Sequence, residues 1–326
     1  MPRNLRSQDA GCSIAQAAAV IGDWWSLLIV REVARGHRRF EDLTGELAIS
    51  REVLTERLDH LVDHRVLART PYPEPARHEY VLTDAGWALA PTLIAMQDWA
   101  DHWLLGDGAL TGMPAADSTE AARVHDLLGT RVPGPLPLPG TGLSPGTAAS
   151  GTGGGSADVV AETGATVLFT YPTTGTMSPA VSPTVSPTVS PTVSPTVSPT
   201  VSPAVSPAWR SVPGAMGCTL ENRLFRDRLA EFTAAGVAVH GVSTQPADEQ
   251  RAFAETEGIP FPLLSDVDLR LAAALRLPTF RAGGTTRLKR LILVVDRLRV
   301  VRHVVFPVQD IPAAVAEALE AARALT

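Results

Sequence analysis

The sequence predicts a multidomain protein, in which a mainly α-helical N-terminal domain is followed by an α/β C-terminal domain. Three observations lead to this prediction. Residues 1–106 carry apolar residues at helical spacing, interrupted by one pair of short strand-like runs. Residues 157–326 alternate continuous apolar runs with helical stretches. Between them, residues 132–156 are rich in Pro, Gly, Ser and Thr, which is typical of a flexible segment. We assign residues 107–131 to a connecting helix and to the start of the C-terminal domain.

Composition limits the classes of protein to consider. The 326 residues are enough for two domains, and 45% of them are hydrophobic, so each domain can bury a core. The net charge of -6 excludes binding of nucleic acid over the whole surface, so any DNA contact must come from a local basic patch. No apolar run reaches the length of a membrane span, and the first residues lack the apolar core of a signal peptide. We therefore expect a cytoplasmic protein without a membrane partner.

The N-terminal domain begins with four helical segments. Helices are expected over residues 13–23 and 24–35, and a short helix is expected from Phe40. Ser50 suits the N-cap of the fourth helix because its hydroxyl can accept a hydrogen bond from a free backbone N–H. The apolar residues of this fourth helix recur at helical spacing and predict its buried stripe: Leu54, Leu58, Leu61 and Val62.

A two-stranded wing and a terminal helix complete this domain. Residues 66–70 and 78–82 are strand-like and flank a Pro-rich tip at 71–76. A last long helix is expected to start at Thr83 and to carry Leu89, Leu93, Met96 and Trp99. Large apolar residues on a terminal helix of so small a domain favour pairing with a second subunit, so we expect a homodimer formed through the helix that contains Trp99.

These elements carry motifs that resemble the HxlR family of MarR-like repressors. The matching segments follow one another in the family's order, over about residues 10–105: Cys12 near the start, GDWWSLLI, RFEDL, ISREVLTERL, YVLTDAG and Trp99. The resemblance implies a homodimeric winged helix-turn-helix that binds double-stranded DNA. In this arrangement the helix after Ser50 enters the major groove and the wing lies beside it.

By position, the resemblance places eight residues on or near the side that faces DNA. They are Ser50, Arg51, Thr55 and Arg57 in the recognition helix, Arg38 and Arg39 before the preceding helix, and Arg77 and His78 in the wing. We expect the arginines to contact phosphates and the first turns of the recognition helix to contact bases. For Arg51 and Arg57, an intrahelical salt bridge is the alternative, because the same helix carries acidic residues at positions 52, 56, 59 and 63.

The C-terminal domain is expected to contain a sheet covered on both sides by helices. Strands are expected over 165–171, 236–242, 288–296 and 300–306, and helices over 219–235, 248–257, 267–275 and 311–325. A Ser-Pro repeat interrupts the domain at residues 178–208. Proline lacks an amide donor, so the repeat is expected to be disordered or extended, as a tandem expansion tolerated in a surface loop. A phosphorylated or partner-binding tract is the alternative.

Cys218 is expected in the first turn of a helix that follows a buried strand. Free backbone amides and the helix dipole stabilise a thiolate there, and a thiolate is the form that attacks peroxide. Lys289 or Arg290, at the start of a later strand, supplies a positive charge that lowers the pKa of a thiol. Cys12 is the second of the two cysteines. We expect both to be free thiols, because a disulfide framework is uncommon in a reducing compartment.

This domain resembles peroxiredoxins of the alkyl hydroperoxide reductase and bacterioferritin-comigratory type. The matching segments span about residues 120–326: Tyr171-Pro172, GCTLE at 217–221 with FRD at 225–227, GVSTQ at 241–245, FPLLSD at 261–266 and KRLILVVD at 289–296. The resemblance implies a thioredoxin-like fold in which peroxide oxidises Cys218 to a sulfenic acid. It also implies that Arg290 and Pro172 belong to the catalytic set, and that no metal or other cofactor is needed.

The sequence departs from the peroxiredoxin pattern at three points. Ala215 stands where the family has a Thr, the Ser-Pro repeat separates Pro172 from Cys218, and the domain has no resolving cysteine. A sulfenic acid at Cys218 must therefore be reduced by an external thiol, by Cys12 or by another subunit.

The sequence thus predicts a redox-responsive transcription regulator in which Cys218 senses peroxide or another oxidant. Cys12 is a second candidate sensor, because some HxlR relatives sense oxidants at this position. The alternative is a one-cysteine thiol peroxidase whose winged helix serves assembly or autoregulation. A third hypothesis is an interaction protein with an inactive redoxin core. Catalytic turnover distinguishes the peroxidase from the other two, and oxidant-dependent DNA binding distinguishes the regulator from the interaction protein.

Overall fold

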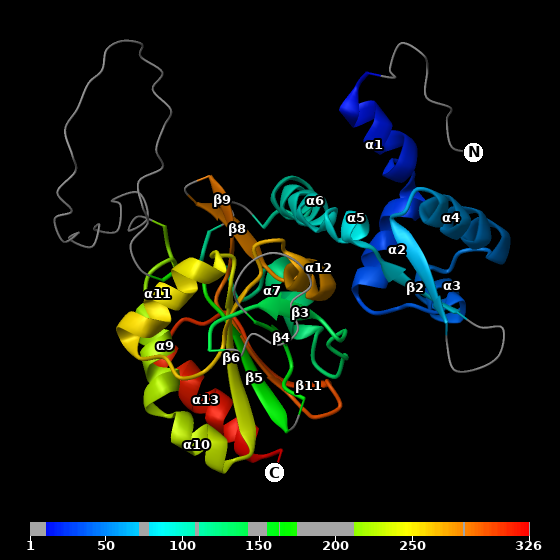
Figure 1. Cartoon of the computed structure of the whole chain (residues 1–326). Helices are drawn as coiled ribbons and strands as arrows, with labels where there is room; N and C mark the ends of the chain where they lie inside the picture. Colours follow the sequence, from blue (N-terminus) through cyan, green and yellow to red (C-terminus); the bar gives the residue numbers. More distant parts are fainter. Residues whose placement is uncertain are drawn as a thin grey trace, which may run out of the picture.

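The computed structural model describes residues 11–71, 78–107, 111–142, 155–162, 164–174, 212–282 and 284–325. Figure 1 shows a helical N-terminal domain and an α/β C-terminal domain, as predicted. Most of the wing tip, Arg77, residues 143–154 and the Ser-Pro repeat lie outside the described residues. No helix in the described ranges is long and apolar enough to span a membrane by itself, although a bent pair, Ser13–Ile21 with Trp24–Ala34, meets the criteria of length and composition together.

The N-terminal domain contains the four predicted helices and the two-stranded wing. In chain order its first elements are α1 (Ser13–Ile21), α2 (Trp24–Ala34), α3 (Phe40–Leu47), α4 (Arg51–Asp63), β1 (Leu67–Pro71) and β2 (His78–Leu82). Asp23 caps α2, because its carboxylate accepts hydrogen bonds from the backbone N–H groups of Trp25 and Ser26. Ser50 caps α4 as predicted, and its hydroxyl accepts from the N–H of Val53. The helices and the wing share one apolar core.

The prediction of one long terminal helix is wrong, because the structure has two helices there. These are α5 (Asp84–Trp87), capped by Thr83, and α6 (Ala90–Trp103). Pro91 lies in the first turn of α6. Proline has no N–H to bond to the preceding turn, so it starts a new helix more readily than it continues an old one.

A five-stranded sheet forms the centre of the C-terminal domain. Its strands are β5 (Ala165–Thr170), β6 (Val237–Ser243), β7 (Leu263–Ser265), β10 (Leu291–Val295) and β11 (Val301–Val305), in the spatial order β11-β10-β5-β6-β7. The pairs β5–β6 and β6–β7 are parallel, whereas β10 pairs antiparallel with both β5 and β11. Every residue of β5 and β10 is buried, as their continuous apolar runs predict.

Each face of this sheet packs against a different set of elements (Figure 1). One face is covered by α9 (Cys218–Asp227), α10 (Leu229–Ala234), α11 (Ala247–Glu257) and α13 (Ile311–Arg323). The other face is covered by α7 (Thr119–His125), α12 (Arg270–Leu275) and the hairpin of β3 (Pro137–Pro139) with β4 (Ser156–Asp158). Alternation along the strands explains the two cores, because Val167 and Phe169 face α9 while Leu168 faces α12.

Two predictions for this domain need correction. Residues 132–156 were expected to form a flexible segment, but β3 and β4 lie within or across its ends, and Leu136 and Leu138 are buried. Burial of these leucines against the sheet fixes the part of the segment before residue 143, although its composition suggests flexibility. The strand expected over 288–296 begins only at Leu291, because Leu288 ends β9 (Thr285–Leu288), which pairs with β8 (Thr279–Ala282).

The two domains are packed against each other. Helix α12 contacts both α2 and α6, and β8 also contacts α6. Ile94 of α6 is buried in the same apolar cluster as α7, α12 and the sheet, and Trp87 packs against that cluster. The terminal helix of the N-terminal domain is therefore also part of the C-terminal core.

Candidate functional site

Cys218 is the first residue of α9 and is 3% exposed. Gly217 before it has a φ of 100°, in the left-handed region that glycine adopts most readily. A Cβ at this position would lie 2.5 Å from Cδ1 of Ile311, so that side chain would have to shift. The backbone conformation therefore favours glycine at the turn before Cys218.

Arg290 holds the thiol and the loop before it, as the resemblance implies. Its Nη2 lies 3.3 Å from Sγ of Cys218, and its Nε donates to Oε2 of Glu221 at 2.8 Å. The same guanidinium donates to the backbone carbonyl oxygens of Gly214 (3.1 Å) and Met216 (3.0 Å). The fold thus brings a fixed positive charge against a sulfur that is 72 residues away in sequence.

Pro172 also lies at this site, although residues 175–211 separate it from Cys218 in sequence. The segment 171–174 follows β5 and is buried throughout. The backbone N–H of Thr173 forms a hydrogen bond to the Cys218 sulfur. Gln245 fixes this segment, because its Oε1 accepts from the N–H of Thr174 at 2.6 Å and its Nε2 donates to the Thr174 carbonyl at 2.8 Å. The insert is therefore accommodated without separating the two halves of the site.

The electrostatics of the thiol differ from the expectation. Burial raises the pKa of the Cys218 thiol above its ordinary value, and the positive charge of Arg290 and the Thr173 amide offset only part of that increase. The expected net lowering is thus wrong for this conformation, because the sulfur is almost fully removed from water. Burial also raises the pKa of Glu221 to about 7, against the opposing effect of Arg290.

Sequence reasoning did not identify all the residues around the thiol. Glu221 is fully buried and, among the described residues, its Oε1 has no hydrogen-bond partner. Arg287 of β9 is 7% exposed; burial lowers its pKa, while the charges of Glu249 and Cys218 act in the opposite direction. The GCTLE motif contains Glu221 and could have pointed to it, whereas nothing in the sequence around Arg287 indicates that it lies near the thiol.

The choice left open between Lys289 and Arg290 is settled by the structure. Nζ of Lys289 pairs with Oε2 of Glu120 in α7 at 2.5 Å, and both side chains are almost fully buried. Burial raises the pKa of Glu120, and Lys289 opposes this effect. Lys289 therefore neutralises a carboxylate at the domain interface, and Arg290 is the residue that faces the sulfur.

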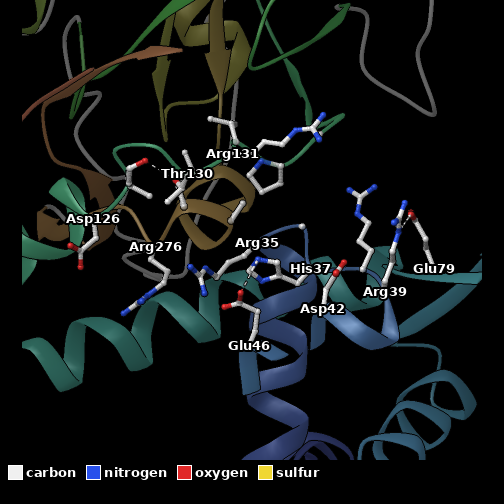
Figure 2. Close-up of a pocket in the computed structure, with 18 of the residues that line it drawn as sticks. Arg35, His37, Arg39, Asp42, Glu46, Glu79, Asp126, Thr130, Arg131 and Arg276 are labelled. Atoms are coloured by element: carbon white, nitrogen blue, oxygen red, sulfur yellow. Dashed lines mark hydrogen bonds and ion pairs between the residues drawn. The ribbon is translucent and has the colours of Figure 1, made fainter. Parts of the chain in front are cut away.

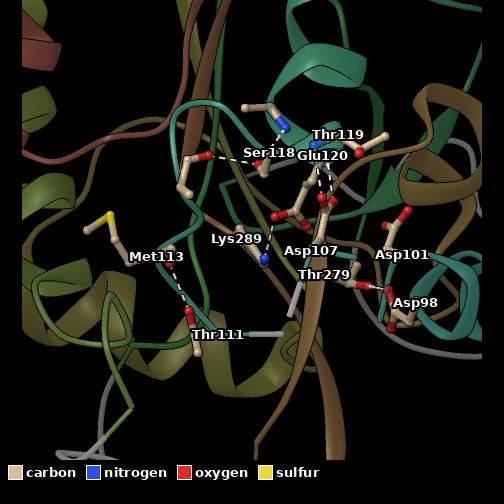
Figure 3. A network of polar contacts seen from close by, with 12 residues as sticks. Asp98, Asp101, Asp107, Thr111, Met113, Ser118, Thr119, Glu120, Thr279 and Lys289 are labelled. Carbon is tan, nitrogen blue, oxygen red and sulfur yellow. Dashed lines mark hydrogen bonds and ion pairs between the residues drawn. The ribbon is translucent and has the colours of Figure 1, made fainter. Parts of the chain in front are cut away.

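The Lys289–Glu120 pair belongs to a buried polar network that reaches α6 (Figure 3). One turn after Glu120, Arg123 makes two hydrogen bonds of 2.8 Å to the carboxylate of Asp101. Thr279 of β8 donates to Oδ1 of Asp98 at 2.6 Å. Asp98 and Asp101 both belong to α6, so this network joins the strand hairpin beside Arg290 to the terminal helix of the N-terminal domain.

The residues expected to face DNA are largely at the surface. Arg51 and Thr55 are exposed on α4, and the Arg51 guanidinium lies 4.7 Å from the centre of the Phe40 ring. Arg39 is exposed and lies 3.4 Å from Glu79, whereas Arg38 is half-buried. The side chains of Ser50 and His78 are also exposed, and Arg77 is outside the described residues.

Arg57 is the exception among these residues. It is 7% exposed, and its guanidinium lies 3.5 Å from Asp23 and 3.7 Å from Glu56. The prediction that Arg57 faces DNA is therefore wrong for this conformation, because the side chain lies between α4 and the start of α2. The closer acidic partner, Asp23, is the N-cap residue of α2. Residue spacing within α4 does not reveal this partner.

Both cysteines are free thiols, and they occupy different environments. Cys12 is the exposed N-cap residue of α1, whereas Cys218 is buried at the start of α9. Helices α1 and α9 lie on opposite sides of the molecule in Figure 1. A disulfide between them within one chain would require a large rearrangement.

The fold and the two sites define a winged helix-turn-helix domain joined to a thioredoxin-like domain of the peroxiredoxin class. Residues 20–107 match the HxlR-like helix-turn-helix model, and residues 211–304 match that of the AhpC/TSA family. The chain belongs to the HxlR-like family in its N-terminal part and to the AhpC/TSA family in its C-terminal part.

Individual relatives match one domain each. An uncharacterized HTH-type transcriptional regulator of Mycobacterium tuberculosis is 41% identical over 102 residues, which are 31% of this chain and 65% of the regulator. One from Bacillus subtilis is 40% identical over 91 residues, 27% of this chain and 84% of the relative. A putative peroxiredoxin of Mycobacterium tuberculosis is 35% identical over 115 residues, 35% of this chain and 75% of the relative.

Two solved structures are also similar to parts of the chain. The crystal structure of peroxidoxin BcpB from Mycobacterium tuberculosis has 26% identity and a TM-score of 0.41, covering 61% of this chain and 97% of its own. The crystal structure of a putative transcription factor has 36% identity and a TM-score of 0.29, covering 33% of this chain and 82% of its own.

Proposed function

We propose that this protein is a redox-responsive, DNA-binding transcription regulator in which Cys218 senses peroxide or a related oxidant. The observation that carries the proposal is the contact of 3.3 Å between Arg290 and the Cys218 sulfur at the start of α9. Family membership supports the two halves of the proposal, a regulator domain and a peroxiredoxin-like domain. The polar network between the domains gives the sensor a physical connection to the regulator.

The proposed chemistry at Cys218 is a two-electron oxidation. The thiolate sulfur attacks one oxygen of the peroxide, the O–O bond breaks, and the sulfur becomes a sulfenic acid. The departing oxygen takes up a proton and leaves as water or an alcohol. Arg290 donates a hydrogen bond at the position where negative charge moves from sulfur to oxygen. An external thiol then restores Cys218 through a mixed disulfide, and a cytoplasmic location would supply such a thiol.

Oxidation at this site would act on its surroundings because the sulfur has little free space. An added oxygen must displace either Arg290 or the loop 214–216 that the guanidinium holds. Residue 289, next to Arg290, is bound to Glu120 in α7, and Arg123 of the same helix binds Asp101 of α6. We propose that this connection transmits the oxidation state of Cys218 to α6.

Helix α6 is the proposed dimer element, and α4 is the proposed recognition helix. Met96, Trp99 and Trp103 are 47%, 56% and 68% exposed on α6, which is high for such large apolar side chains. We propose that a second copy covers them. In such a dimer the two α4 helices would enter adjacent major grooves. Groups at or before the start of α3, in α4 and in the wing would contact DNA: Arg38, Arg39, Ser50, Arg51, Thr55, Arg77 and His78.

Mass spectrometry after substoichiometric peroxide tests the sensing step directly. The full chain is oxidised, trapped with a sulfenic-acid reagent and digested, and the modification of the two cysteines is compared. We expect Cys218 to be modified first, because the Arg290 guanidinium against its sulfur can stabilise the negative charge that moves to the peroxide oxygen. Preferential modification of Cys12, or modification of neither cysteine, would contradict the proposal.

A one-cysteine thiol peroxidase is the second candidate function. The contact between Arg290 and Cys218 favours it equally, but Ala215 provides only its backbone carbonyl, 3.5 Å from the Cys218 sulfur. A hydroxyl at this position is absent, so the bound peroxide would have one donor fewer. Steady-state peroxide consumption with dithiothreitol as the reductant distinguishes the two functions: the peroxidase turns over many times, whereas a sensor needs only one oxidation.

A further inference from the structure

A second concave site lies between the two domains, away from Cys218 (Figure 2). It is a cleft of about 700 Å³, within the size range of small-molecule sites. The N-terminal domain contributes the end of α2, the start of α3 and Glu79 of β2. The C-terminal domain contributes residues of α7, the segment 130–134 and the end of α12. A ligand in this cleft would contact both domains at once.

Charged side chains line the walls of this cleft. Six arginines line it: Arg35, Arg38, Arg39, Arg123, Arg131 and Arg276. Four acidic residues line it as well: Asp42, Glu46, Glu79 and Asp126. Glu32 and Asp101, which pair with Arg35 and Arg123 from outside the lining, balance the remaining difference in charge, so the pairing of each arginine matters more than the total.

Three of the arginines are not neutralised by the protein. Arg35 is paired with Glu32, and Arg123 is paired with Asp101. By contrast, the structure records no hydrogen bond or ion pair for the side chains of Arg38, Arg131 and Arg276 within its described ranges. These three come from both sides of the cleft, Arg38 from the N-terminal domain and the other two from the C-terminal domain.

Arg276 lies close to several other charged groups. Burial and the nearby positive charges of Arg123, Arg35 and Arg31 lower its pKa, and the charge of Glu32 opposes this only in part. Its backbone is left-handed, with a φ of 53°, and its carbonyl oxygen accepts a hydrogen bond from Nε of Arg123 at 3.2 Å. The guanidinium is therefore held in a half-buried position where like charges are close and an anion would be stabilised.

The cleft is unsuited to a metal ion, although Glu32, His37 and Glu46 approach one another at its edge. The Glu32 carboxylate is already bound by Arg31 and Arg35, and His37 lies 2.8 Å from it. A cation there would compete with two guanidinium groups for the same carboxylate.

We propose that this cleft binds a small molecule that carries at least two phosphate or carboxylate groups. Arg38, Arg131 and Arg276 would hold these groups, because arginine binds phosphate and carboxylate through paired hydrogen bonds. Arg131 and Arg276 point in different directions in Figure 2, so they would hold different groups of the ligand. Asp42 and Asp126 line the same cleft and would accept hydrogen bonds from hydroxyl groups of the ligand. A concave site of this size favours a small molecule over a DNA backbone. The proposal is independent of the redox function, since it requires neither peroxide nor a reactive thiol.

Isothermal titration calorimetry of the reduced full chain tests the proposal, with inorganic pyrophosphate and citrate as probes at constant ionic strength. We expect saturable binding of at least one probe. Arg276→Gln, Arg131→Ala and Arg38→Ala should each weaken that binding about tenfold or more, as the loss of a charge-assisted hydrogen bond predicts. Arg251→Ala is the matched control, because Arg251 is exposed on α11 outside the cleft, and it should bind as the wild type does.

Three results would overturn the proposal. One is the absence of saturable binding of both probes. Another is an equal loss of affinity in Arg251→Ala, which would indicate a nonspecific charge effect. The third is a loss of DNA affinity in Arg131→Ala and Arg276→Gln by the same factor as the loss of probe affinity; neither residue is among the proposed DNA contacts, so the cleft would then belong to the DNA surface. Circular dichroism checks that each variant is folded. If Arg276→Gln does not fold, Arg131→Ala provides the test, because Arg131 is exposed.

Discussion

At the scale of single residues, the chemistry depends on three groups that are buried together: Cys218, Arg290 and Glu221. The carboxylate and the sulfur raise the pKa of Arg290, although burial acts in the opposite direction. The arginine in turn opposes the increase that burial causes in the pKa of both its partners. The site thus carries one permanent positive charge and two groups whose protonation can change, so pH and substitution should both affect it in a defined direction.

The reactivity of Cys218 should rise with pH. Its raised pKa keeps the thiol protonated at neutral pH, so the thiolate fraction grows as the pH passes from about 7 to about 9. The rate of sulfenic acid formation, followed by trapping and mass spectrometry at a fixed peroxide concentration, should increase over this range. Cys12, followed in the same digests, serves as the exposed reference thiol. A Cys218 rate that stays constant over this range would show that the thiolate is already formed at neutral pH.

Replacing Arg290 should impair both reactivity and stability. Arg290→Gln removes the charge that opposes the effect of burial on the thiol, so sulfenic acid formation should slow by about tenfold or more. It also leaves Glu221 buried without its partner, which costs about 3–5 kcal/mol in the free energy of unfolding.

The double variant Arg290→Gln/Glu221→Gln separates these two effects. It should recover much of the unfolding free energy, measured by urea denaturation, because no unpaired buried charge remains. It should not recover the reaction rate. Recovery of the rate would show that Arg290 acts only as a structural partner of Glu221.

At the scale of elements, α6 has two sides of different character. One side carries Asp98 and Asp101 and packs on the C-terminal domain, whereas Met96 and Trp99 are exposed. In the proposed dimer, one side of α6 would contact the C-terminal domain and the other side a second subunit. A shift of the C-terminal domain surface under α6 would then change the geometry of the dimer.

A charged residue on the exposed side of α6 should therefore separate the dimer. Met96→Asp places a carboxylate in the proposed apolar interface, and light scattering at micromolar concentration should show monomers and a loss of DNA binding. Gln97→Asp is unsuitable as a control, because Gln97 donates to the Leu277 carbonyl at the domain interface. Arg251→Asp on α11 is suitable and should remain dimeric. A wild-type protein that is already monomeric would contradict this role of α6.

Sequence patterns predicted the elements better than the environments of single residues. The apolar runs of β5 and β10 and the Ser50 cap follow from local chemistry, and the structure agrees with them. The burial of Arg57 and the raised pKa of Cys218 depend on packing between helices that are distant in sequence. Pro91 marks the break between α5 and α6 in the sequence, whereas the prediction of one long helix rests on apolar periodicity alone.

At the scale of the whole molecule, polar side chains that no sequence pattern brings together connect the domains. Lys289 and Glu120 are 169 residues apart, and Thr279 and Asp98 are 181 apart. Only the fold shows that Thr279 of the hairpin beside Arg290 binds Asp98 of α6, and that Lys289 binds α7, whose Arg123 binds α6. The same packing creates the cleft between the domains, whose arginines also come from both of them.

The coupling between the domains can be tested without touching the thiol. In Glu120→Gln/Lys289→Met the buried ion pair is removed as a unit, so little stability should be lost. Sulfenic acid formation at Cys218 should proceed at the wild-type rate, whereas the effect of peroxide on DNA affinity should shrink. Arg223→Gln/Glu257→Gln removes an ion pair outside this route and is the matched control. An unchanged peroxide effect in the first variant would show that the signal travels elsewhere.

The central claim is that Cys218 controls DNA binding, and the most direct measurement is a titration of DNA affinity against peroxide. The wild type, Cys218→Ser and Cys12→Ser are compared on a duplex from the region upstream of the protein's own gene, at a fixed salt concentration because phosphate contacts depend on salt. We predict that peroxide changes the affinity of the wild type, changes that of Cys12→Ser to a smaller extent, and leaves that of Cys218→Ser unaltered. If Cys218→Ser responds like the wild type while Cys12→Ser does not respond, the sensor is the N-terminal thiol and the account is contradicted.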